Sequence, residues 1–194
     1  NQAKVTRLEK DVKILKANAA PHAAVVGENI TAVTSVATGA NSRVELRFPD
    51  NSLTRLGANS RFTLRGQGHT IDLDKGVLLF EVPEKLRDAK VRTAAVTAAV
   101  TGGTAIVEFL PGGFVKLMVI EGKVDMFLNN DPSQFITLNA GEMIIQPVSA
   151  TTMNPKVTFD LKLLLKTSKL INVDSEPNVK EINDALNAQQ NEIN

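Results

Sequence analysis

Apolar and polar residues alternate along much of this chain. Val44, Leu46 and Phe48 alternate with charged side chains, which is the two-residue period of a half-buried strand. A Pro-Asp-Asn-Ser turn follows, and residues 53–56 return as a second strand. The segment therefore predicts a β-hairpin, with Asn51 in a left-handed turn position that asparagine tolerates.

Similar patterns recur between residues 25 and 148, where turn signals separate apolar stretches at intervals of about 8–12 residues. We therefore predict a mainly β fold, either an antiparallel β-sandwich or a double-stranded β-helix-like stack. The alanine-rich segment 94–100 favours a buried strand over a helix, because it contains valines and threonine and is followed by glycines. The alternation predicts these core residues: Leu46, Phe48, Leu56, Phe62, Leu64, Phe80, Val107, Leu117 and Val119.

The two ends of the chain differ from this middle part. Residues 1–24 hold apolar positions at helical spacing, but their β-branched residues favour two short strands, and both readings stay open. Apolar positions between residues 157 and 171 predict a short amphipathic helix. Residues 176–194 predict a marginal helix that frays into a polar tail. We thus expect a lead-in at 1–24, a β domain at 25–150 and a C-terminal helical segment with a polar tail at 151–194.

Five short motifs occur in order along the β region. They are the segment from Thr38-Gly39 to Asn59-Ser60, then Gly76–Phe80, Val100–Thr104, Val119–Val124 and Asn139–Glu142. Together they resemble the FecR domain, the extracytoplasmic module of bacterial ferric-citrate-type regulators, over about residues 25–148. The sequence departs from the family pattern at Asn51, where glycine is usual, and in the glycine pair of the third motif.

This resemblance implies a non-catalytic extracytoplasmic domain that acts in protein–protein interaction or signal reception in the cell envelope. Regulators of this type sense a loaded outer-membrane transporter and pass the signal to a cytoplasmic sigma factor. They carry an anti-sigma segment and a membrane helix before the domain. This sequence starts at Asn1 with family-like residues close behind. The sequence is therefore either a trimmed form of such a regulator or, as we expect, a secreted member that lacks these segments. We expect it in the periplasm, at the outer membrane or secreted, with an envelope protein as its partner.

Composition narrows the range of possible functions further. The formal net charge is +1, so no overall field attracts nucleic acid. The chain has no cysteine, which excludes disulfides and thiolate chemistry. No apolar run approaches the roughly 20 residues that span a bilayer, so this chain is not expected to cross a membrane by a helix. Its oligomeric state does not follow from the sequence.

The residues that catalysis requires are sparse. His22 and His69 lie far apart in sequence, in expected loop or turn positions, and no His-x-His pair suggests a metal site. A Gly-x-Ser-x-Gly nucleophile motif is missing, and the glycine-rich third motif lacks the Gly-Lys-Ser/Thr of a phosphate loop. We expect no enzymatic activity, no metal and no cofactor.

The one notable charge feature is a set of five arginines between residues 41 and 66. Four of them have the parity of outward-facing strand residues and are the candidate partner-binding residues: Arg43, Arg47, Arg61 and Arg65. On one exposed face they would suit carboxylate or phosphate groups, so an alternative function is the binding of anionic envelope glycans or small carboxylates. A solvated sheet face is the simpler interpretation. Arg55, flanked by leucines, is instead expected to pair with Asp50.

Overall fold

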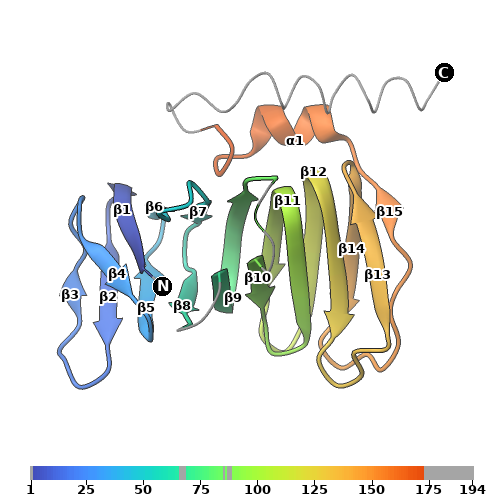
Figure 1. The fold of residues 1–194 in the computed structure, drawn as a ribbon, viewed down its shortest axis with the longest axis horizontal. Helices are drawn as coiled ribbons and strands as arrows, with labels where there is room; N and C mark the ends of the chain where they lie inside the picture. Colours follow the sequence, from blue (N-terminus) through green and yellow to red (C-terminus); the bar gives the residue numbers. More distant parts are fainter. Residues whose placement is uncertain (1, 66–68, 85, 87–88, 173–194) are drawn as a thin grey trace.

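The computed structural model describes residues 2–65, 69–84, 86 and 89–172, and strands dominate it (Figure 1). The strands are β1 (Gln2–Glu9), β2 (Val12–Lys16), β3 (His22–Ala23), β4 (Asn29–Thr31), β5 (Thr34–Thr38), β6 (Arg43–Arg47), β7 (Leu53–Leu56), β8 (Arg61–Leu64), β9 (His69–Val82), β10 (Ala89–Arg92), β11 (Val96–Phe109), β12 (Phe114–Leu128), β13 (Phe135–Asn139), β14 (Glu142–Pro147) and β15 (Val157–Thr158). A single helix among the described residues, α1 (Leu161–Thr167), follows them.

Three long strands hold the fold together because each changes partners along its length. The first half of β9 pairs with β8 and β10, and its second half pairs with β7 and β11. In the same way β11 passes from β10 to β9, and β12 passes from β14 to β13. The changes occur at Gly76, at Gly102 and Gly103, and at Gly122, all of which have positive φ. Glycine adopts this backbone conformation without the strain that a Cβ atom would cause.

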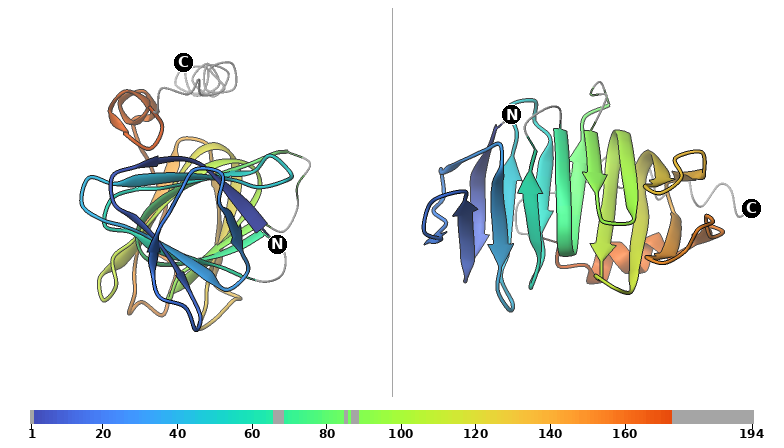
Figure 2. Two further views of the ribbon diagram at one scale, coloured as in Figure 1. Left: turned by 90° about the vertical axis from the view of Figure 1, so that its left-hand side faces the viewer. Right: turned by 90° about the horizontal axis from the view of Figure 1, so that it is seen from below.

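These crossings divide the sheet into two layers. Layer one runs β4-β1-β6-β7 through the second halves of β9 and β11 and the first half of β12 to β14 and β15. Layer two runs β3-β2-β5-β8 through the complementary halves of the long strands, with β10, to β13. Viewed along the stack, the strands wind around a common centre (Figure 2). All described pairings are antiparallel except β9 with β10, which is parallel. The predicted mainly β fold is confirmed. Its strands form one mixed sheet, which winds into a double-stranded stack, one of the two predicted alternatives.

The main core lies between the two layers. Layer one contributes Leu46, Phe80 and Leu117, and layer two contributes Phe62 and Leu64, among others. All nine predicted core residues are at most 2% exposed. The alanine-rich segment enters β11, and its small inward side chains are buried, which confirms the prediction of a strand there.

The two ends of the chain join the same architecture. The first residues form strands, since β1 pairs with β6 and β2 pairs with β5. The C-terminal helix is shorter than predicted, because Val157 and Thr158 pair with β14 instead. Helix α1 begins after Asp160, whose side chain accepts a hydrogen bond from the Leu163 amide at 2.9 Å. The helix predicted within 176–194 lies outside the described residues. Among the described residues no helix is long and apolar enough to cross a membrane.

A second, smaller apolar cluster lies on the outer side of layer one. We call its sheet part the outer apolar patch, formed by Leu53, Leu79, Ile106 and Ile120. Residues 160–172, which contain α1 and the segment after it, cover this patch and are called the C-terminal strap. The helix lies outside the wound strands (Figure 2). The strap buries Leu161, Leu170 and Ile171 against the patch.

Candidate functional site

Residues of the FecR-like motifs meet at the corner where β7, β8 and β9 pass between the layers. The Thr38 hydroxyl donates a hydrogen bond to the Gly57 carbonyl and accepts one from the Ser60 amide at 3.0 Å. The Ser60 hydroxyl accepts a hydrogen bond from the Val77 amide at 2.9 Å. A Cβ atom on Gly76 would collide with Ser60. At this corner the motif residues therefore maintain the crossing of the strands.

The four candidate arginines do not form a single stripe. Arg43 and Arg47 lie on β6 in layer one, with Val44 and Leu46 between them pointing into the core. Arg61 and the residue that follows β8, Arg65, belong to layer two, where the intervening Phe62 and Leu64 point into the core from the opposite side. Since the two layers turn their outer faces away from each other, the four arginines do not share one exposed face. The role of these arginines in partner binding stays a prediction.

The two arginines of layer two are half-exposed and paired with aspartates. The Arg61 guanidinium lies 3.4 Å from Asp74, with both side chains 44% exposed. Arg65 forms an ion pair with Asp72, which Arg92 also approaches at 3.7 Å. This group carries three positive and two negative charges on an open sheet face.

The prediction for Arg55 is wrong, because its partner is Glu45 and not Asp50. Arg55 and Glu45 lie directly opposite each other in the register of β6 and β7. The Arg55 Nε atom donates to Glu45 Oε2 at 2.9 Å, and the Thr6 hydroxyl donates to Glu45 Oε1 at 2.8 Å. Partial burial alone would raise the pKa of Glu45. The hydrogen bonds from Arg55 and Thr6 and the charges of Arg55 and Arg47 outweigh this effect, so the pKa is lowered.

Asp50 pairs with a histidine instead. Its Oδ2 atom lies 2.9 Å from Nδ1 of His69, whose ring packs 5.1 Å from that of Phe48. His69 is thus a partly buried residue at the start of β9 and does not lie in the turn that the sequence led us to expect. The Ser52 hydroxyl lies 3.5 Å from the same Nδ1 atom. A Ser-His-Asp triad uses both ring nitrogens, one for each partner, so this trio does not have the geometry of a triad.

The other histidine, His22, lies in β3 with about half of its side chain exposed, and its Nε2 atom is 2.8 Å from Glu28. The described residues also include no group of three or more His, Asp and Glu side chains that could hold a metal ion.

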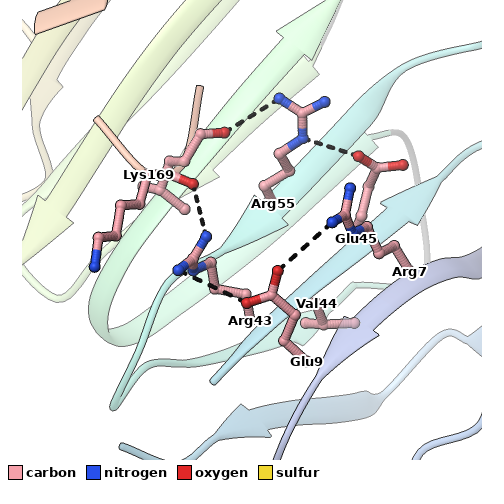
Figure 3. A pocket seen from close by; sticks show the side chains of 8 residues that line it. Arg7, Glu9, Arg43, Val44, Glu45, Arg55 and Lys169 are labelled. Atoms are coloured by element: carbon pink, nitrogen blue, oxygen red, sulfur yellow. Dashed lines mark hydrogen bonds and ion pairs between the residues drawn. The ribbon is translucent and has the colours of Figure 1, made fainter. Parts of the chain in front are cut away.

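A polar cluster ties the C-terminal strap to layer one (Figure 3). Arg43 donates to the Lys169 carbonyl at 3.1 Å, and Arg55 donates to the carbonyls of Leu170 and Ile171 at 3.1 and 3.4 Å. Glu9 lies 3.7 Å from Arg43. The hollow between these side chains has a volume of about 20 Å³, which is room for roughly one water molecule. We call Arg43 and Arg55 the arginine clamp.

Sequence reasoning missed this clamp. It selected Arg43 for its outward parity and gave Arg55 another partner, because nothing in the local pattern shows that residues 169–171 return to β6 and β7.

Comparison with known proteins then shows a similarity to a known family. Residues 34–125 match the family model described as FecR protein. Over these residues, just under half of its length, the chain is similar to the FecR family. Within this range lie the motif corner, the arginine clamp and the strand crossings of β9 and β11. No curated protein matches the chain.

Solved structures support the assignment at the level of fold. Two crystal structures of a "putative anti-sigma factor" from Parabacteroides distasonis ATCC 8503, at 1.65 and 2.50 Å resolution, are similar to this chain. Both have a TM-score of 0.55, with 19% and 20% sequence identity. Each match covers 66% of this chain and 61% of that protein, so this chain matches less than two thirds of its length.

Proposed function

We propose that this chain is a non-catalytic regulatory module that receives a signal by binding another protein in the bacterial cell envelope. The observation that carries the proposal is the similarity to the FecR family at residues 34–125. The similarity in fold to a "putative anti-sigma factor" agrees with a regulatory role. An extracytoplasmic location, in the periplasm or at the outer membrane, is part of the proposal and follows from the family resemblance.

The polar chemistry of the domain supports a binding role over a catalytic one. The guanidinium groups of the arginine clamp are engaged with the carboxylates of Glu9 and Glu45 and with backbone carbonyls. The Ser52, His69 and Asp50 side chains meet at a single ring nitrogen. Neither arrangement offers a nucleophile that is activated by a base. A net charge of +1 gives no general attraction to nucleic acid, so we propose a protein as the partner.

The proposal is tested in the bacterium that encodes the chain. Tagged protein should be recovered from the periplasmic or outer-membrane fraction. Deletion of the coding region should change transcript levels of a limited set of genes. The core variant Phe80→Ala should have the same effect, whereas Arg61→Gln, a surface change, should leave folding intact. Recovery from the cytoplasm, or unchanged transcripts after deletion, would refute the proposal.

The half-exposed arginines of layer two favour a second candidate, the binding of an anionic polysaccharide or small carboxylate. Titration of purified protein with alginate should then show binding that weakens as salt rises, because ionic screening acts over about 8–10 Å. The double variant Arg61→Gln/Arg65→Gln should lose this binding, and Lys13→Gln should keep it. Equal binding by the double variant and the wild type would exclude these arginines as the site.

A further inference from the structure

The outer apolar patch has an unusual position for a buried surface. It lies on the outer side of layer one, whose inner side already contributes to the main core. The patch and the main core form separate clusters, and among the described residues the strap, together with Phe159, packs on the patch from outside. Leaving the patch uncovered would therefore expose apolar surface without opening the space between the two layers.

The strap itself is a small element. Helix α1 has seven residues, fewer than an isolated helix needs to be stable in water. On its solvent side Leu163 is 58% exposed, next to the exposed residues Lys162 and Lys166. The strap is attached to the sheet by three buried side chains, by the partly buried Leu164 and Leu165, and by the hydrogen bonds from the arginine clamp.

We propose that the outer apolar patch and the arginine clamp form a docking surface for an amphipathic helix of a partner protein, and that the strap occupies this surface as a reversible cover. The inference rests on the proposed function, because a receiving module requires a surface for its partner. The seated strap indicates the chemistry of the occupant. It places a short helix and the turn after it over the patch, with apolar side chains facing the sheet.

The arginine clamp also determines the direction in which a partner helix would bind. The last carbonyls of a helix have no partners within the helix and carry partial negative charge, so guanidinium groups bind them favourably. Arg43 and Arg55 meet the strap's carbonyls just after α1 ends. Glu45 orients Arg55 from the opposite strand. A partner helix would therefore dock with its C-terminal end over β6 and β7 and its apolar side on Ile106 and Leu79.

The first test is native-state hydrogen exchange of the wild-type chain across low urea concentrations. Strap amides such as those of Leu164 and Ser168 should exchange at least tenfold faster than the amides of β9 and β11. Their exchange should depend little on urea, as expected for local opening. If strap and core amides share one urea dependence, the strap opens only with the whole domain, and the proposal is wrong.

The second test weakens the strap and measures whether the uncovered patch and clamp bind a helical peptide. Leu170→Ser/Ile171→Ser weakens the strap and leaves the patch and clamp unchanged. A labelled peptide of residues 160–172 should bind this variant at least tenfold more tightly than the wild type, by fluorescence anisotropy. Adding Arg55→Gln should reduce the binding at least fivefold, and adding Arg61→Gln should not change it. Circular dichroism first establishes that each variant is folded.

A folded strap variant that fails to bind the peptide would overturn the docking surface. If the variant does not fold, hydrogen exchange of the wild type decides the question alone. Both tests use purified protein, whereas location and transcripts test the regulatory role, so the two proposals can fail independently.

Discussion

Glu45 and Arg55 face each other across β6 and β7 and form an ion pair of 2.9 Å, with side chains that are only 10% and 11% exposed. The pair links two parts of the molecule that are far apart in sequence. Arg55 also donates to the carbonyls of Leu170 and Ile171. Arg55, whose charge is balanced by Glu45 within the sheet, therefore also holds the C-terminal strap.

Removal of Arg55 should therefore be costly. We expect Arg55→Ala to lower the free energy of unfolding by about 3 kcal/mol, because Glu45 would keep a largely buried charge without its partner. Urea denaturation measures this loss. The matched control is Arg61→Ala on the open face of layer two, which should change stability by less than about 0.5 kcal/mol. Equal losses for the two variants would show that the Glu45–Arg55 pair contributes no more to stability than an exposed arginine does.

The stability of the domain should also depend on pH through Glu45. Its pKa is lowered in the folded state relative to the ordinary value of 4.5. The unfolded chain therefore binds the proton more readily. The stabilisation is complete above about pH 4.5 and is lost as pH falls through the lower folded pKa. Glu45→Gln should flatten this decline in thermal melts between neutral and acid pH. A curve parallel to that of the wild type would contradict the assignment.

The sequence predicted the parts of this fold that local patterns determine. Strand alternation placed Phe48, Phe62 and Phe80 in the core, and turn chemistry placed Asn51 at positive φ, which the structure confirms at 70°. Alternation also assigned the outward arginines correctly within each strand. It could not assign strands to layers, because β6 and β8 are separated by a crossing that depends on long-range contacts. For the same reason it missed the clamp and the partner of Arg55.

Two fully buried phenylalanines, one in each layer, test the two-layer core directly. Phe62 points inward from layer two and Phe80 from layer one, and both are fully buried. Phe62→Ala and Phe80→Ala should each cost roughly 3–5 kcal/mol in urea denaturation, through lost burial and the cavity that remains. A loss below about 1 kcal/mol for either variant would mean that its layer does not pack as described.

The turn at Asn51 tests a departure from the usual family residue. Its φ of 70° is a conformation that glycine adopts freely and β-branched residues resist. Asn51→Gly should be neutral or slightly stabilising, and Asn51→Val should cost on the order of 1–2 kcal/mol. Urea denaturation of both variants gives the comparison, and equal stability would refute the turn geometry.

Two glycines with nearly the same φ, only one of them at a strand crossing, test whether the crossing needs glycine. Gly112 and Gly122 have nearly the same φ, 75° and 74°, so a side chain strains the backbone equally at both. A Cβ atom on Gly112 would meet open space, whereas one on Gly122 would collide with the Gly102 carbonyl, where β11 and β12 cross between the layers. Gly112→Ala should therefore cost about 1 kcal/mol. Gly122→Ala should cost about 3 kcal/mol or more, since overpacking adds to the strain. Thermal and urea denaturation measure both, and similar losses would mean that the crossing tolerates a wider separation of the strands.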